Sequence, residues 1–148
     1  MPKLQIACVL SLIPLLASCG EDRALPERID VRMTGSGYRW EIRHAGWDSK
    51  FGTDDDIVSV SRLKLPVGTP VFIDLRSDDF IYGLSQIDFE LSGVAVPGLE
   101  NSIEFVPGQV GEFSLRGNQL CGSAHPDLMV TLEVVEEDGF VAALNARR

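Results

Sequence analysis

Residues 57–75, IVSVSRLKLPVGTPVFIDL, show the pattern from which the fold class follows. Two segments rich in branched apolar residues, 57–65 and 70–75, flank a short connection that contains Pro66 and Gly68. Neither segment carries the 3.6-residue period of an amphipathic helix, and proline and glycine are typical of turns between strands. This region therefore predicts two β-strands joined by a tight turn.

Similar short segments recur along the rest of the chain. They are Ile29–Met33, Tyr38–Arg43, Ile87–Leu91, Ser102–Val106, Glu112–Leu115 and Met129–Val135. Eight short strands separated by turn residues predict an all-β sandwich or barrel. At the end, Glu136–Leu144 places Phe140, Val141 and Leu144 on one helical face, which predicts a short C-terminal helix.

The N-terminus differs from the rest of the chain. Lys3 precedes an apolar run, Leu4–Ala17, which is shorter than the roughly 20 residues that span a bilayer as a helix. We predict that residues 1–18 are a secretory signal peptide. The following residues, 19–28, are polar and aperiodic and predict a tether, so that one domain of 29–148 follows.

Leu16-Ala17-Ser18-Cys19 resembles a bacterial lipobox, in which the cysteine carries the lipid. On this interpretation the protein is exported and anchored by Cys19 to a bacterial membrane, with its domain facing the periplasm or the cell exterior. The alternative is an ordinary signal peptide that leaves Cys19 as a free thiol.

Cys121 is then the single cysteine of the predicted domain, so no internal disulfide can form. It begins the segment 121–129, CGSAHPDLM, which brings a thiol, the imidazole of His125 and the thioether of Met129 together before the last predicted strand. These are ligand types that copper selects. The alternative is a buried, inert cysteine beside a hydrogen-bonded histidine.

The net charge limits the macromolecular partners of the chain, and one acidic loop raises the question of calcium binding. The formal net charge is −9, which disfavours nucleic acid and favours a basic partner. The loop Asp48–Asp56 concentrates carboxylates around Gly52 but lacks EF-hand spacing, so we expect a hairpin loop and not a calcium site.

From Trp40 to Val135 the chain resembles the extramembrane domain of cytochrome c oxidase subunit II. The similarity rests on four segments, LPVGTPV at 65–71, SDDFIY at 77–82, AVPGLEN at 95–101 and QLCGSAH at 119–125. The resemblance implies a cupredoxin-like Greek-key fold and a dinuclear copper centre, CuA, that accepts electrons from cytochrome c.

Only part of that copper centre is retained. Cys121 and His125 match the family's second cysteine and second histidine. The family's first histidine, first cysteine, carbonyl-donating glutamate and methionine fall, in that order, on Tyr82, Gly117, Gln119 and Leu128. Two bridging thiolates hold the copper ions of a CuA centre together, so a site with Cys121 alone cannot form a normal CuA centre.

What remains is a mononuclear copper site on Cys121 and His125, with Met129 or Tyr82 completing it and the main-chain carbonyl of Gln119 as a further ligand. The resemblance also suggests Trp40 as the point where electrons enter, although a buried core tryptophan fits the sequence as well. We expect His44, the other histidine, on the surface at a turn and not in the site.

Three functions follow from these residues. The first is a tethered cupredoxin-like protein that binds one copper ion for electron transfer or copper handling in a respiratory context. The second is a copper-free structural or accessory subunit of a haem-copper oxidase. The third, a thiol enzyme using Cys121 and His125, lacks a third orienting residue and ranks last.

The expected partners are a haem-copper oxidase catalytic subunit, a basic cytochrome c and the membrane, and we predict no catalytic activity for the chain alone.

Overall fold

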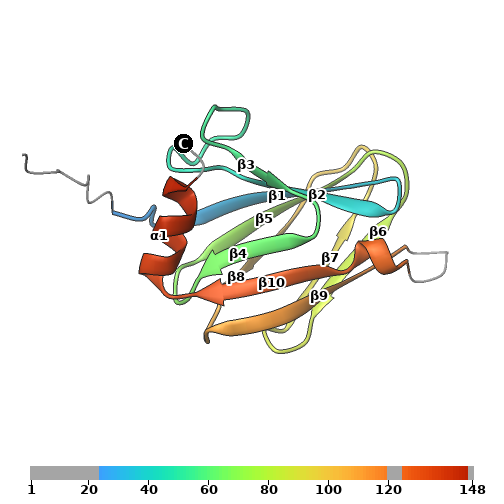
Figure 1. Ribbon diagram of the computed structural model, residues 1–148. Coiled ribbons are helices and arrows are strands. Elements are labelled where there is room, and N and C mark those ends of the chain that lie inside the picture. Colours follow the sequence, from blue (N-terminus) through green and yellow to red (C-terminus); the bar gives the residue numbers. More distant parts are fainter. Residues whose placement is uncertain (1–23, 120–124, 147–148) are drawn as a thin grey trace, which may run out of the picture.

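The computed structural model describes residues 24–119 and 125–146, which form two packed β-sheets and a C-terminal helix (Figure 1). The strand order is β3-β2-β1-β5-β8 in the first sheet and β4-β10-β9-β6-β7 in the second. In chain order the elements are β1 (Ile29–Ser36), β2 (Arg39–His44), β3 (Ile57–Ser59), β4 (Arg62–Pro66), β5 (Val71–Ser77), β6 (Tyr82–Gln86), β7 (Leu91–Ala95), β8 (Asn101–Phe105), β9 (Gly111–Gln119), the 3-10 turn η1 (Pro126–Leu128), β10 (Val130–Val135) and α1 (Glu137–Asn145). The predicted all-β sandwich with a C-terminal helix is confirmed.

The central strand of the first sheet is β1. It pairs antiparallel with β2 and parallel with β5. Ile29, Val31 and Met33 point into the core, and the residues between them are only partly buried. This two-residue alternation is what a strand with one buried face requires.

Residues far apart in sequence meet in the second sheet. There β10 pairs parallel with β4 and antiparallel with β9, and β6 pairs antiparallel with β9. In the last of these pairs Tyr82 lies opposite Gln119. The start of β6 and the end of β9 therefore meet at one end of the sandwich, which brings together two of the candidate copper ligands, Tyr82 and Gln119.

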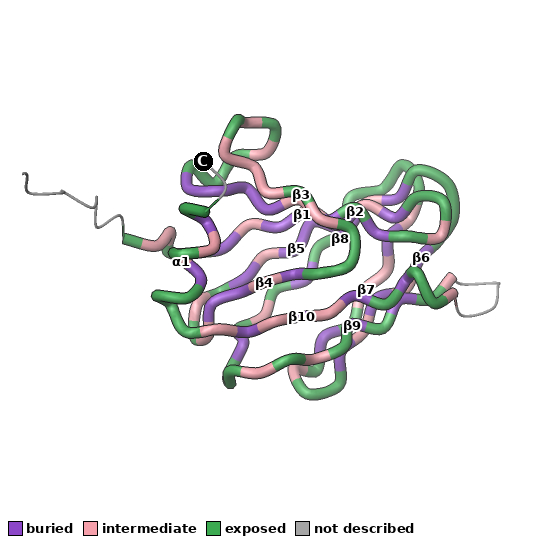
Figure 2. The backbone as a smooth tube through the Cα atoms, viewed as in Figure 1, coloured by how far each residue is buried: buried purple, intermediate pink, exposed green. Residues whose placement is uncertain are grey.

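The core fills the space between the sheets. Figure 2 shows buried residues recurring along the strands of both sheets. Trp40, Tyr82 and Phe140 are among its largest fully buried side chains. Each large apolar side chain buried in this way contributes about 1.5–3 kcal/mol to folding.

Helix α1 closes the end of the sandwich opposite η1 (Figure 1). Phe140 and Leu144, four residues apart, are both buried, and Val141 packs partly against the core. Residues at this spacing share one face of a helix. The helix predicted at Glu136–Leu144 is confirmed, and it begins and ends one residue later than predicted, at Glu137 and Asn145.

The predicted strand 57–65 is divided in two. A short turn separates the two strands. Across it the Ser59 hydroxyl donates a hydrogen bond to the Arg62 carbonyl, and the two oxygen atoms are 2.5 Å apart. At this turn the chain passes from β3 in the first sheet to β4 in the second. Ile57 of β3 packs partly against the core, whereas Val58 and Val60 are exposed, so this part of the apolar run does not mark one buried face.

The strand predicted at Ile87–Leu91 is wrong. Residues 87–90 form the turn between β6 and β7, and β6 itself was not predicted. Ile87 is 77% exposed, and Glu90 adopts a left-handed backbone with φ of 51°. The alternating Ile87, Phe89 and Leu91 imitate a strand, whereas the side-chain amide of Gln86 holds the turn through Asp88 and the Phe89 amide.

Candidate metal centre

The candidate site lies where β6 begins, β9 ends and η1 leads into β10 (Figure 1). Cys121, the predicted thiolate ligand, is outside the described residues, as is Cys19. Gln119 and His125 bracket the segment that contains Cys121, and both are described. The described members of the candidate site are His125, Tyr82, Gln119 and Met129.

His125 is positioned by an aromatic ring. Its imidazole stacks on Tyr38, with ring centroids 5.0 Å apart and planes inclined by 22°. Nδ1 is buried and has no hydrogen-bond partner among the described residues, since the nearest Asp127 oxygen is 3.8 Å away. One face of the ring is thus covered by Tyr38, while the side chain as a whole is 43% exposed.

Tyr38 lies in the turn between β1 and β2. Gly37 and Tyr38 have φ of 57° and 63°, the left-handed backbone of a tight two-residue hairpin turn. The Gly37 amide donates to Asp79 Oδ2 at 2.7 Å, and the Tyr38 amide donates to the Tyr82 hydroxyl at 3.2 Å. These bonds fix a conformation that is uncommon for a bulky residue.

Tyr82 is completely buried, and its hydroxyl donates to Asp79 Oδ1 at 2.7 Å. Burial, and then this hydrogen bond, raise the pKa of Tyr82. Burial also raises the pKa of Asp79, but the hydrogen bonds from Tyr82, Gly37 and Phe80 outweigh it and hold the pKa of Asp79 below its usual value. Tyr82 would have to give up the Asp79 bond to become a metal ligand.

Gly117 lies against η1. A Cβ atom added at Gly117 would collide with the Leu128 carbonyl oxygen and would lie 2.7 Å from Trp40 Nε1. A side chain there requires the backbone of η1 to move. The position of the family's first cysteine is therefore filled by close packing in this chain.

Leu128 and Met129 point in different directions. Leu128 is fully buried, whereas Met129 is 42% exposed and lies beside Gly37 and Arg39 on the surface. The position at which the family has methionine is thus occupied here by a buried leucine. Met129 would have to turn inward to reach a metal on His125.

Trp40 is fully buried and packs on Tyr82, with ring centroids 5.6 Å apart. Its Nε1 atom has no hydrogen-bond partner in the described part of the chain. Phe80, 40% exposed, stacks on Tyr38 at 5.2 Å and meets Tyr82 edge-on at 6.4 Å. Trp40 belongs to the core and connects to the surface through this aromatic series.

The prediction that His44 lies on the surface is wrong. Its side chain is only 6% exposed and packs at 5.3 Å on Phe140 of α1. The cause is that α1 returns over the end of β2, which the local sequence around His44 does not reveal. The residue is also at the opposite end of the sandwich from His125, so it cannot join the same site.

The acidic loop 45–56 connects β2 and β3, as expected for a hairpin loop. Asp55 Oδ2 accepts from the Trp47 and Asp48 amides, and Asp56 Oδ2 accepts from the Gly52 amide. These carboxylates hold the loop's own backbone. Within residues 24–119 and 125–146, no group of three or more histidine, cysteine and acidic side chains is arranged to hold a metal.

No protein-family model matches the sequence. The chain is 26% identical over 141 residues to the alternative cytochrome c oxidase subunit 2 of Bradyrhizobium diazoefficiens, covering 80% of this chain and 51% of that protein. It is also 26% identical over 132 residues to cytochrome c oxidase subunit 2 of Cereibacter sphaeroides, covering 89% of this chain and 39% of the relative. This chain resembles cytochrome c oxidase subunit II. The subunit II-like chain spans about half, or less, of the length of these relatives.

Solved structures show the same fold. The crystal structure of the periplasmic domain of cytochrome oxidase subunit II of Bradyrhizobium japonicum superposes on the subunit II-like chain with a TM-score of 0.65 at 18% identity, covering 80% of this chain and 92% of that one. A chain of a haem-copper terminal oxidase dimer gives a TM-score of 0.54 at 19% identity, covering 87% and 78%. The predicted likeness to the periplasmic domain of subunit II is confirmed.

Sequence reasoning missed the residues that surround the candidate ligand in this subunit II-like fold. Tyr38, which stacks on His125, and Asp79, which binds Tyr82, were not predicted as parts of the site. A signal existed for Asp79, because it lies three residues before Tyr82 in one of the segments that resemble subunit II. Nothing in the local sequence pairs Tyr38 with His125.

Proposed function

We propose that this chain is an exported, membrane-tethered cupredoxin-like protein that binds a single copper ion for electron transfer or copper handling in a respiratory context. The placement of His125 carries the proposal. Its imidazole is held against Tyr38, four residues after Cys121, and its buried Nδ1 has no partner among the described residues. A fixed imidazole with an available nitrogen is suited to a metal.

The chain offers few further ligands. Cys121 and His125 would hold the ion, with the main-chain carbonyl of Gln119 beside them and Met129 or Tyr82 completing the set. Copper bound there would supply one-electron redox chemistry. The protein's own contribution is to stack the His125 imidazole on the Tyr38 ring, which itself stacks on Phe80.

Copper titration of the full chain tests the proposal. We expect one copper ion per chain and a thiolate-to-copper absorption band that disappears in Cys121→Ser, because a thiolate is required for that band. His125→Gln should weaken binding by more than about a hundredfold, since it removes a direct ligand. His44→Gln is the matched control: it removes a histidine at the other end of the sandwich and should leave the titration unchanged. Absence of binding at micromolar copper would exclude the proposal.

A second candidate function, a copper-free structural or accessory subunit of a haem-copper oxidase, is favoured by a different observation. Three positions of the family's copper centre are committed to internal contacts here: Tyr82 to Asp79, Gly117 to η1, and Leu128 to the core. A chain of this kind would use the fold only to contact other subunits of the oxidase. A negative copper titration combined with co-purification of oxidase subunits would support this function.

Lipid attachment at Cys19 is the proposed means of tethering. No helix within the described residues is long and apolar enough to cross a bilayer. Acyl chains contribute about 0.8 kcal/mol per buried methylene, so two or three of them anchor a protein firmly. The mass of the mature protein should therefore exceed that of residues 19–148 by its acyl groups, and an unmodified Cys19 would refute the assignment.

The proposed partners are a haem-copper oxidase catalytic subunit and a basic cytochrome c. The formal net charge of −9 favours attraction of a basic protein. Association with such a cytochrome should weaken by about tenfold or more between 20 and 200 mM salt, because added ions screen charges on the two surfaces. Salt-independent association, measured by calorimetry, would contradict an electrostatic contact. We assign no catalytic activity to the chain alone.

A further inference from the structure

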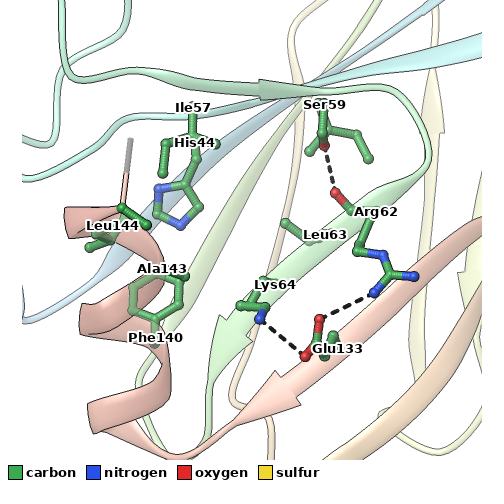
Figure 3. Close-up of a pocket in the computed structure, with 12 residues that line it drawn as sticks. His44, Ile57, Ser59, Arg62, Leu63, Lys64, Glu133, Phe140, Ala143 and Leu144 are labelled. Carbon is green, nitrogen blue, oxygen red and sulfur yellow. Dashed lines mark hydrogen bonds and ion pairs between the residues drawn. The ribbon is translucent and has the colours of Figure 1, made fainter. Parts of the chain in front are cut away.

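A cavity of about 420 Å³ lies beneath α1, between the helix and the neighbouring edges of the two sheets (Figure 3). It is at the opposite end of the sandwich from His125 (Figure 1). Most of its lining is apolar and comes from Ile42, Ile57, Leu63, Phe140, Ala143 and Leu144. Its volume is within the range of sites that hold small molecules.

His44 forms part of the cavity wall, with its ring beside α1 (Figure 3). The side chain is 94% buried, as its exposure of 6% shows, and neither Nδ1 nor Nε2 has a hydrogen-bond partner within the described ranges. Leaving a buried polar group unpaired costs about 1–3 kcal/mol. Both nitrogens are covered by neighbouring protein atoms, so the ring has to turn before a ligand in the cavity can reach one of them. A hydrogen bond to the turned ring would recover part of this cost.

The other side of the cavity carries charge. Lys64 Nζ and Arg62 Nη1 lie 3.1 and 3.6 Å from oxygens of the same Glu133 carboxylate (Figure 3). These side chains satisfy one another and are partly exposed. The unpaired polar atoms therefore belong to His44, and the surface between His44 and this ion-pair cluster is apolar.

We propose that the cavity binds a small apolar molecule that carries a hydroxyl group, with the hydroxyl on His44 and the apolar body between Leu63 and Phe140. A neutral imidazole has one N–H donor and one acceptor nitrogen, and a hydroxyl can pair with either. Burial lowers the pKa of His44 to about 4, so the ring is neutral at pH 7. A carboxylate would be a poor occupant, because burying a charge beside a neutral group is costly.

Two matched probes, 4-propylphenol and propylbenzene, test this assignment in the full chain. They share an apolar body and differ in the hydroxyl group. We expect 4-propylphenol to bind about tenfold more tightly than propylbenzene, the effect of one hydrogen bond to a buried group. Titrations followed by NMR should show shifts in His44 and α1.

Variants separate the hydrogen bond from the cavity. His44→Phe should remove the preference for the phenol while still admitting both probes. Ala143→Trp, at a half-buried position of α1, should fill the cavity and prevent binding of both. His125→Gln, at the other end, should change neither affinity. Failure of both probes to bind, or an equal affinity of wild type for the two, would overturn the proposal, and neither result depends on copper binding.

Discussion

Gly117→Ala is expected to lower the free energy of unfolding by about 3 kcal/mol, a large effect for one methyl group. The added Cβ would meet the Leu128 carbonyl and would lie 2.7 Å from Trp40 Nε1 and 2.9 Å from Leu128 Cβ. Trp40 and Leu128 are fully buried and cannot move aside without disturbing the core. Urea denaturation followed by tryptophan fluorescence would measure the change.

Gly108→Ala is the matched control. A Cβ at Gly108 meets no atom within 4 Å, so this variant should unfold within about 0.5 kcal/mol of wild type. Equal stability of Gly117→Ala and wild type would show that β9 does not pack closely on η1. The same contact predicts that Gly117→Cys, which supplies the second thiol of the family's pattern, destabilises the fold and does not restore a dinuclear centre.

Stability is expected to fall by about 3 kcal/mol between pH 6.5 and pH 4 through His44 alone. Burial lowers the pKa of this imidazole from 6.5 to about 4, an effect that Asp56 opposes by its charge. The unfolded chain therefore takes up a proton at a higher pH than the folded chain does. The stabilisation is complete above pH 6.5 and is lost as the pH falls to about 4.

Comparison of wild type with His44→Phe isolates this contribution from that of the carboxylates. The charged groups around His44, besides Asp56, are the cavity side chains Arg62, Lys64 and Glu133, which both proteins share. The difference between their unfolding free energies, measured by urea denaturation from pH 4 to pH 8, should follow a single titration. A difference that stays constant across this range would show that His44 is not buried as a neutral ring.

The sequence predicted the larger features of the fold because they depend on local patterns. Alternation marks the buried face of β1, and the spacing of Phe140 and Leu144 marks that of α1. It failed where tertiary contacts decide the outcome. Ile87 belongs to an alternating apolar pattern that is typical of a strand, but it lies in a turn. His44 belongs to a segment that is typical of a turn, but it is buried beneath a helix.

The candidate site shows the same division. The segment from Cys121 to His125 could be recognised from its ligand types and spacing. The hydrogen bond that commits Tyr82 to Asp79, and the contact that closes Gly117 against η1, depend on strands paired across the sheet. No local pattern in the sequence predicts such contacts. The sequence did show that other residues replace several of the family's copper ligands, which indicated a site different from CuA.

The central position of β1 also determines how the domain bears a load. A pull on the chain before Ile29 acts along β1, whose residues pair with both β2 and β5 over nearly its whole length. Such a pull shears these hydrogen bonds together, whereas an edge strand can be peeled away one bond at a time. An anchor attached ahead of β1 would therefore hold the domain by a strand that is paired along both of its edges.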